Sequence, residues 1–530
     1  MDNKVNFKRL GTMIDCSRNA VMNVSSLKNW IDILADLGYT TLLLYTEDTY
    51  EVENQEYFGY LRGRYTREEL KEIDDYAFLK GIEVIPCIQM LAHLGQIFRY
   101  RQYREINDCD DILLVGDEKT YRLIDDMFSS LSKCLRSKIV NVGMDEAYMI
   151  GRGKYLDKNG LQDKSGILLE HLKRVSEIAV KYGYQLTMWA DIFITLAGGA
   201  YNINDVEVPD WVKEQIPENT SLIYWDYYST DYSHYDSQIK RHNRIKENSW
   251  FAGGLWTWQG FAPHNDFSMR ASQAALCACR DNGVQNIFFT MWGDNGGECT
   301  PFMLLLSLYY VSCLTRGETD TEVIKKGFAE KYGIAFDDFM LLDLPDTPNW
   351  ADSIKDPDKY MLYNDCFMGV FDSTVRDGDA ESYKICAEKL SALKTNDRFG
   401  FMFDTMCALC KALSLKFDIG IKTRSAYSSG REEVKKLLPV YDELAERLTD
   451  FYYIYRKQWM TVNKPHGFDV QDIRLGGLIF RVRHCRERLC EYAEGKTDRI
   501  PELEEKLLNY YGSEPISENC WGTTVSPNGI

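Results

Sequence analysis

The sequence predicts an α/β fold, a (β/α)8 or TIM barrel followed by an all-α C-terminal domain. Between residues 10 and 314, eight short apolar runs typical of buried parallel strands alternate with segments of helical periodicity. Beyond that point the strand signals stop and only helical periodicity remains. Eight βα units close into a barrel, whereas a doubly wound open sheet, the alternative fold, would lack its usual G-x-G-x-x-G after the first strand.

The strands are recognised by β-branched, aliphatic and aromatic residues between turn signals. They are predicted at residues 10–15, 41–45, 82–87, 138–142, 185–189, 221–225, 250–256 and 286–291. An apolar stripe from Val24 to Leu34, closed by Gly38, predicts the first helix. Thr66 and Glu69 have the spacing of a capping box and open the second helix. Further helices are predicted at 119–136, 166–182, 235–246, 268–282 and 301–314.

The change in periodicity predicts two domains, a barrel over residues 1–320 and a helical domain over 321–530. A chain of 530 residues is longer than a single hydrophobic core usually supports. In the second domain, the segments with the clearest helical periodicity are 383–393, 403–417, 431–456 and 471–495.

Composition narrows the functional class. The net charge of −18 argues against nucleic acid and anionic membranes as partners. No run of 18 apolar residues occurs and the N-terminus lacks a secretory apolar region, so we expect a cytoplasmic protein without a membrane span. The 15 Cys are scattered and the seven His include no H-x-x-x-H pair, so we expect no metal and no cofactor.

The most informative stretch is the Asp145–Glu146 pair, which follows the fourth predicted strand and Gly143. In a barrel, the carboxyl ends of the strands form the edge where active sites are built. Neighbouring residues of a regular strand point to opposite faces, but in the loop beyond it both carboxylates can turn toward one pocket. An Asp-Glu pair considered alone is more often part of a solvated surface loop than of an active site. The residues around it therefore decide between the two interpretations.

Aromatic and polar residues gather at the same predicted edge. Tryptophan follows or ends four consecutive strands, as Trp189, Trp225, Trp256 with Trp258, and Trp292. The strand ends also carry polar and further aromatic residues, namely Arg18, Glu47, His93, Tyr227, Tyr228 and Asp294. Indole rings stack on the C–H faces of sugars, while carboxylates and arginine bind hydroxyl groups. The edge therefore predicts a carbohydrate site, because the basic or glycine-rich features of a phosphate site are sparse.

Glycoside hydrolysis usually places two carboxyl groups on opposite sides of the bond that breaks. Adjacent Asp145 and Glu146 cannot easily do so. They fit better the substrate-assisted exception, in which the 2-acetamido group of the sugar is the nucleophile. Two close carboxyl groups also push their pKa values apart, so one can stay charged and the other protonated near neutral pH.

Five segments carry a resemblance to a known family. They are residues 15–19, 66–70 with 81–86, 143–146, 188–191 and 292–294. In these motifs the chain resembles glycoside hydrolase family 20, the β-N-acetylhexosaminidases, and its helical C-terminal domain resembles the shorter bacterial branch of that family. The Asp-Glu pair is the specific element, and the other motifs are individually weak.

The resemblance implies a role for each acid–base residue. Glu146 is the general acid and then the base that activates water. Asp145 holds the acetamide nitrogen while the acetamide oxygen attacks the anomeric carbon and forms an oxazoline. His93, backed by Glu47, hydrogen-bonds toward Glu146. The family usually has an Asp four residues before this histidine, whereas this chain has Gln89.

The resemblance also implies substrate contacts. Arg18 and Asp294 bind sugar hydroxyls, and Trp189, Trp225 and Trp292 wall the acetamide pocket and the sugar face. The family has a tyrosine, generally from the seventh strand, that caps the acetamide oxygen. Here that strand carries Trp256-Thr257-Trp258, so Tyr227 is the first candidate for the cap and Tyr228 the second.

The resulting hypothesis is an exo-acting retaining β-N-acetylhexosaminidase that releases terminal β-linked GlcNAc or GalNAc from an oligosaccharide. One alternative is a catalytically silent carbohydrate-binding barrel. Another is a barrel hydrolase in which two distant carboxylates act as nucleophile and acid. The sequence leaves open the preference for GlcNAc or GalNAc and whether the chain forms a homodimer.

Overall fold

Eight parallel strands form a closed barrel in the computed structural model, which describes residues 7–201, 203, 206–347, 356–393, 398–510 and 512. Each strand pairs with the next, and β1 also pairs with β8 to close the sheet. The strands are β1 Arg9–Asp15, β2 Thr41–Tyr45, β3 Glu83–Cys87, β4 Ile139–Asn141, β5 Gln185–Trp189, β6 Thr220–Trp225, β7 Trp250–Gly254 and β8 Asn286–Met291. The predicted barrel is confirmed and the open doubly wound sheet is wrong. Strand β7 ends at Gly254, so Trp256 lies beyond it.

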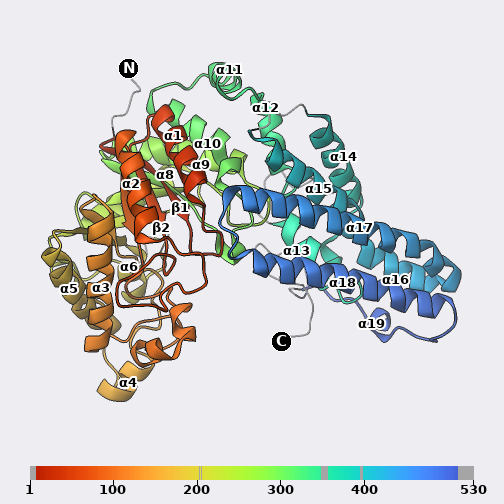
Figure 1. Ribbon diagram of the computed structural model, residues 1–530, viewed down its shortest axis with the longest axis horizontal. Coiled ribbons are helices and arrows are strands. Elements are labelled where there is room, and N and C mark those ends of the chain that lie inside the picture. Colours follow the sequence, from red (N-terminus) through yellow and green to blue (C-terminus); the bar gives the residue numbers. More distant parts are fainter. Residues whose placement is uncertain are drawn as a thin grey trace. The chain divides into compact units, whose positions relative to one another are not determined.

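Helices of the βα units surround the barrel, with α1, α2 and α3 beside one another on its outside (Figure 1). The long helices are α1 Val24–Leu37, α2 Arg67–Leu79, α3 Glu118–Cys134, α5 Lys164–Lys181, α8 Tyr232–Ile245, α9 Asn265–Asp281 and α10 Leu305–Thr315. The short ones are α4 Lys154–Asn159, α6 Asp191–Leu196 and α7 Asp210–Lys213. The predicted helix ends are confirmed. Gly38 ends α1 with φ 81°, and the Thr66–Glu69 capping box opens α2.

Side chains that point into the barrel alternate with side chains that point outward. The interior cluster comprises Met13, Leu43, Tyr45, Ile85, Cys87, Trp189, Ile223, Trp250, Ala252 and Phe288. In β2, β3 and β5 the last interior residue is followed two residues later by a polar residue, Glu47, Gln89 or Asp191 respectively. The alternation that builds the core thus also sends polar side chains to the carboxyl edge.

The chain divides into two compact units. The first comprises Met1–Leu255, Phe267–Trp292 and Ser307–Thr319, and the second comprises Trp256–Asp266, Gly293–Leu306 and Asp320–Ile530. The loops that follow β7 and β8 therefore pack mainly with the helical part of the chain. The boundary at residues 320 and 321 stays a prediction.

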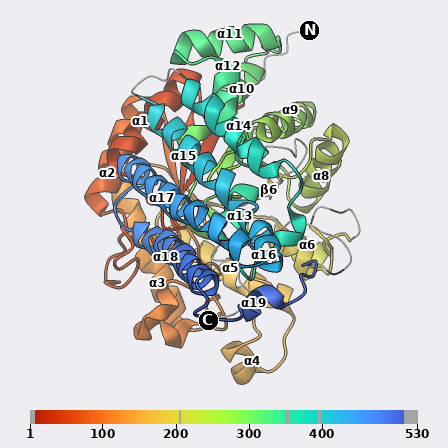
Figure 2. The same ribbon diagram turned by 90° about the vertical axis from the view of Figure 1, so that its right-hand side faces the viewer.

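The second unit is helical. Its helices are α11 Thr321–Tyr332, α12 Phe336–Phe339, α13 Pro357–Tyr363, α14 Asp379–Ala392, α15 Gly400–Lys416, α16 Ile419–Ser429, α17 Arg431–Val462, α18 Phe468–Ala493 and α19 Pro501–Glu504. Helices α17 and α18 lie side by side in both views (Figures 1 and 2), joined by a hydrogen bond from Tyr452 to Asp472. Short 3₁₀ segments are η1 Ile97–Arg99, η2 Arg101–Ile106, η3 Asp294–Gly296, η4 Pro301–Leu304, η5 Met340–Asp343 and η6 Asp372–Thr374.

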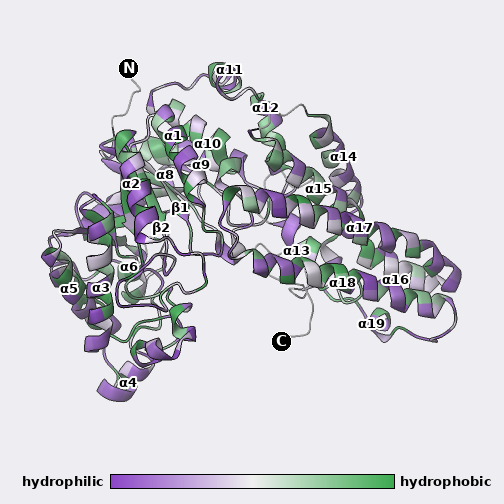
Figure 3. Ribbon diagram, viewed as in Figure 1, coloured by the Kyte–Doolittle hydropathy of each residue, from purple (hydrophilic) through white to green (hydrophobic). Residues whose placement is uncertain are grey.

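Hydropathy follows the burial of the helices (Figure 3). Helix α4 buries none of its residues and is hydrophilic along most of its length, whereas α3 mixes hydrophilic and hydrophobic residues because one of its faces is buried. Within the described part of the chain, no helix combines the length and the apolar character needed to cross a bilayer.

The capping box of α2 gives a first prediction. The Thr66 hydroxyl accepts a hydrogen bond from the Glu69 amide at 3.1 Å, and the Glu69 carboxylate accepts one from the Thr66 amide at 2.9 Å. We expect Thr66→Ala to weaken the first turn of α2 by about 1 kcal/mol, because one amide loses its acceptor. Hydrogen exchange followed by mass spectrometry should then show about fivefold faster exchange there. Thr66→Ser keeps the acceptor and serves as the control, and equal exchange in the two variants would contradict the assignment.

Candidate active site

The backbone after β4 turns in an unusual way that brings two carboxylates to one place. Gly143, Met144 and Glu146 have φ values of 69°, 67° and 53°, in the left-handed region that non-glycine residues rarely adopt. As a result the neighbouring side chains do not diverge as they would in a strand. The His93 Nε2 atom lies 3.2 Å from Asp145 Oδ2 and 3.6 Å from Glu146 Oε2, so both carboxylates face the same imidazole ring.

Asp145 is buried and has specific partners. Gln89 Nε2 donates a hydrogen bond of 2.7 Å to Asp145 Oδ1, and His93 lies against the other oxygen. Burial alone would raise the pKa of Asp145, but the charge of His93 and the hydrogen bonds of His93 and Gln89 outweigh it and lower that pKa. The carboxyl group therefore stays ionised although it is almost out of contact with water.

Gln89 fits against the turn that carries Asp145. Its Oε1 atom accepts a hydrogen bond of 3.1 Å from the Met144 amide. A Cβ atom on Gly143 would lie 2.0 Å from the same oxygen, so only glycine leaves room for this side chain. The residue that departs from the family pattern is thus bonded to both the backbone and the carboxylate of the turn.

Glu146 has a different environment from its neighbour. Its side chain is 47% exposed, and its amide donates a hydrogen bond of 3.1 Å to Asp191 Oδ2. Partial burial and the negative charge of Asp145 raise the pKa of Glu146. Asp191 is fully buried, and burial together with the charge of Asp145 raises its pKa to about 7. The two adjacent carboxyl groups are therefore biased toward opposite protonation states.

His93 is held in place by its backbone as well as its ring. It has φ 56°, and its amide donates a hydrogen bond of 3.0 Å to Asp111 Oδ2. Burial disfavours the charged ring, but the negative charges of Asp145 and Glu47 outweigh it and raise the pKa of His93 to about 10. The ring is therefore a cation at neutral pH.

Glu47 is positioned by partners other than the one the sequence suggested. Its Oε1 atom lies 3.1 Å from Arg18 Nη2 and accepts a hydrogen bond of 3.1 Å from the Tyr45 hydroxyl. Burial raises the pKa of Glu47 to about 7, although Arg18 and His93 oppose the shift. The backbone of His93 is bonded instead to Asp111, and Glu47 influences the histidine through its charge.

Hydrogen bonds connect these groups across four strands. Gln89 Nε2 also donates to the Tyr45 hydroxyl at 3.0 Å, and that hydroxyl in turn donates to Glu47. A continuous path therefore runs from Arg18 after β1 through Glu47, Tyr45 and Gln89 to Asp145 after β4.

Aromatic rings line the same part of the barrel. Trp189 and Trp292 have ring centroids 5.9 Å apart, and Trp292 meets Tyr45 edge-on at 4.8 Å. Trp225 stacks on Tyr227 at 5.2 Å, and its Nε1 atom donates a hydrogen bond of 3.2 Å to Asp191.

The two candidate tyrosines differ in exposure. Tyr227 is buried and is hydrogen-bonded by the side chains of Trp292 and Thr290. Tyr228 is 50% exposed. The order of the two candidates for the acetamide cap stays a prediction.

Three predicted site residues belong to the second unit and are described within it. Trp256 and Trp258 stack on each other with centroids 4.5 Å apart, and both rings are buried. Asp294 opens the short segment η3, whose next residue, Asn295, accepts a backbone-carbonyl hydrogen bond from Arg474. Their assignment to substrate binding stays a prediction.

Sequence reasoning missed several residues that the structure places around Asp145. Gln89 was visible only as a departure from a family pattern. Asp191 lies two residues after Trp189, so the alternation of β5 could have included it. Asp111 lies in the long connection between β3 and α3, where no local signal identifies it. Within the described residues, no group of three or more His, Cys, Asp or Glu side chains could hold a metal ion.

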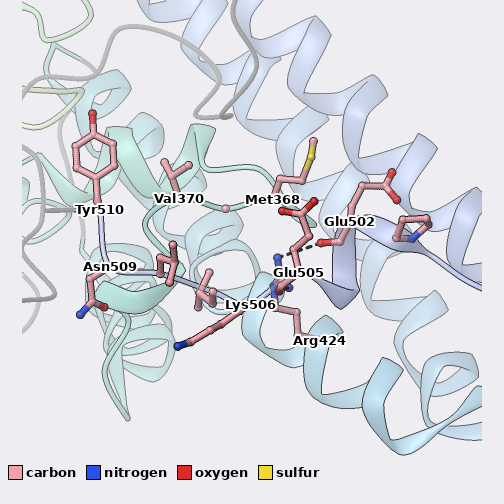
Figure 4. Close-up of a pocket in the computed structure, with 12 residues that line it drawn as sticks. Met368, Val370, Arg424, Glu502, Glu505, Lys506, Asn509 and Tyr510 are labelled. Atoms are coloured by element: carbon pink, nitrogen blue, oxygen red, sulfur yellow. Dashed lines mark hydrogen bonds between the residues drawn. The ribbon is translucent and has the colours of Figure 1, made fainter. Parts of the chain in front are cut away.

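A separate cavity of about 520 Å³ lies within the helical unit (Figure 4). Arg424 lies at its wall, and the guanidinium donates hydrogen bonds to the backbone carbonyls of Phe367, Glu502 and Glu505 at 2.7 to 3.2 Å. The Arg424 guanidinium is therefore bonded to the backbone that lines the cavity. The cavity contains none of the predicted site residues.

Comparison with known families gives the decisive finding. Residues 7–236 match the model described as glycosyl hydrolase family 20, catalytic domain, and residues 337–521 match the Glycoside Hydrolase 20C C-terminal domain. The chain belongs to glycoside hydrolase family 20. The family 20 resemblance of the barrel and of the helical domain is therefore confirmed.

Individual relatives agree with this family. The chain is 28% identical over 230 residues to Beta-hexosaminidase 3 of Arabidopsis thaliana, which covers 41% of this chain and 42% of that protein. It is 23% identical over 220 residues to Hexosaminidase D of Bos taurus, covering 40% and 60%. The chain thus spans about half the length of these curated relatives. A solved β-N-acetylhexosaminidase from Bacteroides fragilis aligns at 17% identity with a TM-score of 0.46, covering 61% and 69%.

The electrostatics of the family 20 site give a second prediction. We expect the His93 ring to stay protonated up to about pH 10, because its pKa is raised, while His171 and His242 stay neutral down to about pH 4 because burial lowers theirs. Ring ¹⁵N shifts of histidine-labelled protein at pH 8 should include an imidazolium signal from His93. His93→Gln should remove that signal, and a neutral His93 at pH 8 would contradict the charged pair with Asp145.

Proposed function

We propose that this family 20 protein is an exo-acting retaining β-N-acetylhexosaminidase that uses the acetamide group of its substrate as the nucleophile. The observation that carries the proposal is the pairing of a buried, ionised Asp145 with a more exposed Glu146 on one imidazole ring. The substrate would be an oligosaccharide that ends in β-linked GlcNAc or GalNAc.

Asp145 suits the role of orienting the acetamide. Its lowered pKa keeps a negative charge that can accept the acetamide N–H, which makes the acetamide oxygen a better nucleophile toward the anomeric carbon. His93 and Gln89 hold the carboxylate in one orientation, so this interaction would need little rearrangement. In the proposed first step the oxygen bonds to the anomeric carbon, the glycosidic bond breaks and an oxazoline forms.

Glu146 suits the role of proton donor. Its exposed side chain can reach a leaving-group oxygen, and its raised pKa increases the protonated fraction near neutral pH. After the leaving group departs, the resulting carboxylate can take a proton from the water that opens the oxazoline. The product then keeps the β configuration, because the anomeric carbon is attacked twice.

Trp189, Trp225 and Trp292 would wall the reacting sugar, and Arg18 would bind a hydroxyl while remaining paired with Glu47. Membership of family 20 supports the release of a single terminal sugar. The names of the relatives, which are hexosaminidases, support the substrate class.

If Glu146 is the general acid, the effect of replacing it should depend on the leaving group of the substrate. We expect Glu146→Gln to lower kcat for a natural disaccharide by about 10² to 10⁴-fold. The loss should shrink for a dinitrophenyl glycoside, because this leaving group departs without a proton. The matched variant Asp145→Asn should slow both substrates similarly, since it impairs the nucleophile. Steady-state kinetics on the two substrates measure this, and normal turnover by Glu146→Gln would refute the assignment.

If the acetamide oxygen is the nucleophile, kcat/KM should depend on the N-acyl group of the substrate. Replacing the acetamide by its mono-, di- and trifluoro forms withdraws electrons from the carbonyl oxygen, so kcat/KM should fall stepwise along the series. A barrel hydrolase with two distant carboxylates would show little slope and would also cleave glycosides without an acetamide. A silent binding barrel would bind the sugar and cleave none of them. Kinetics of the four substrates separate these outcomes.

A further inference from the structure

A cluster of three tyrosines, two exposed and one half-buried, lies on two loops at the carboxyl end of the barrel. Tyr57 and Tyr60 come from the loop after β2, and Tyr100 comes from the loop after β3. Their ring centroids are 5.2 to 6.1 Å apart, and the Tyr100 hydroxyl donates a hydrogen bond of 3.1 Å to the Tyr60 carbonyl. Tyr57 and Tyr60 are each 44% exposed. We call these three residues the tyrosine platform.

The platform is attached to the candidate active site. Gly59, between two of its tyrosines, packs so closely that a Cβ atom there would lie 2.1 Å from the Asp48 carbonyl oxygen. Asp48 follows Glu47, the partner of Arg18. Arg62 donates a hydrogen bond of 3.0 Å to Asp48 and another to the Ser17 carbonyl, next to Arg18. The loop therefore rests on Ser17 and Asp48, the chain neighbours of Arg18 and Glu47 in the proposed sugar site.

The loop is also fixed internally. Arg64 donates hydrogen bonds to the carbonyls of Glu56 and Phe58. Leu61 is 72% exposed and has φ 62°, a backbone conformation that is unfavourable for a bulky residue. A loop that is braced by two arginines and still holds large apolar side chains in solvent is preorganised without burying them. Exposed apolar clusters of this kind mark binding surfaces, and strained backbone collects at functional sites.

We propose that the tyrosine platform binds the part of the glycan that lies beyond the terminal sugar of the substrate. This inference rests on the proposed function, because an exo-acting enzyme has only the leaving-group side available for further sugars. The C–H faces of pyranose rings pack on aromatic rings, and phenol hydroxyls at the ring edges can bond to sugar hydroxyls. The platform would thus select saccharide leaving groups over small ones.

The test compares saccharide leaving groups with the much smaller fluoride. Tyr57→Ala and Tyr60→Ala should each lower kcat/KM for diacetylchitobiose and triacetylchitotriose by about 3- to 10-fold. The same variants should change kcat/KM for N-acetylglucosaminyl fluoride by less than twofold, because fluoride offers no ring to stack. Tyr60→Phe keeps the ring and loses only its hydroxyl, so it should lower kcat/KM for the oligosaccharides less than Tyr60→Ala does. Tyr453→Ala removes an exposed tyrosine of α17 and controls for loss of an exposed ring.

Three results would overturn the proposal. Equal losses on the fluoride and the oligosaccharides would mean that the loop only supports Arg18 and Glu47. Unchanged kcat/KM on both the fluoride and the oligosaccharides would mean that the rings do not bind the substrate. A wild-type dimer that dissociates in Tyr57→Ala, measured by sedimentation, would assign the platform to a second copy of the chain.

A binding measurement separates this proposal from the proposed function. Calorimetry of triacetylchitotriose with Glu146→Gln, alone and with Tyr57→Ala, tests the platform without turnover. If wild type cleaves neither fluoride nor oligosaccharide but binding still weakens 3- to 10-fold without the ring, the hydrolase assignment fails and the platform stands. If binding is unchanged, the platform fails whatever the enzyme hydrolyses.

Discussion

The site depends on keeping one carboxylate charged while it is buried. An isolated carboxylate out of water would take up a proton, since the desolvation of a charge costs far more than protonation. Asp145 avoids this because the charged ring of His93 lies 3.2 Å away and Gln89 donates at 2.7 Å. The same proximity stabilises the imidazolium, so the histidine and the carboxylate sustain each other's charge. Removing either would leave the other as an unpaired buried ion.

The negative charge of Asp145 shifts the pKa values of the carboxyl groups around it. It raises the pKa of both Glu146 and Asp191, adding to the effect of burial. Glu47 lies farther along the hydrogen-bonded path, and its pKa is raised mainly by burial. The protein thus lowers the pKa of one carboxyl group, Asp145, and raises the pKa of three others nearby by varying burial and partners. Acid–base chemistry needs such differences, because identical groups would titrate together.

Much of this arrangement could be predicted from the sequence because it follows from short-range periodicity. The bounds of β2, β5 and β8 coincide with the apolar runs, and the capping box at Thr66 is local. The sequence could suggest the convergence of Asp145 and Glu146 but could not establish it, because it depends on left-handed residues at Met144 and Glu146 that no composition rule requires. Asp111 and the tyrosine platform depend on how long loops fold back, which periodicity does not encode.

The last two βα loops show a further limit of reading a barrel strand by strand. These loops follow β7 and β8 in the chain, yet the side chains that bond to them come from the helical unit. Asp358 accepts hydrogen bonds from the amides of Phe261 and Ala262 at 2.9 and 3.0 Å. Glu298 is buried with Lys359 Nζ at 2.6 Å and Arg474 Nη1 at 2.8 Å. The segments that carry Trp258 and Asp294 are thus bonded to side chains of the helical domain, the first through Asp358 and the second through Lys359 and Arg474. The acid–base pair, by contrast, is bonded to His93, Gln89 and Asp191, which follow strands of the barrel.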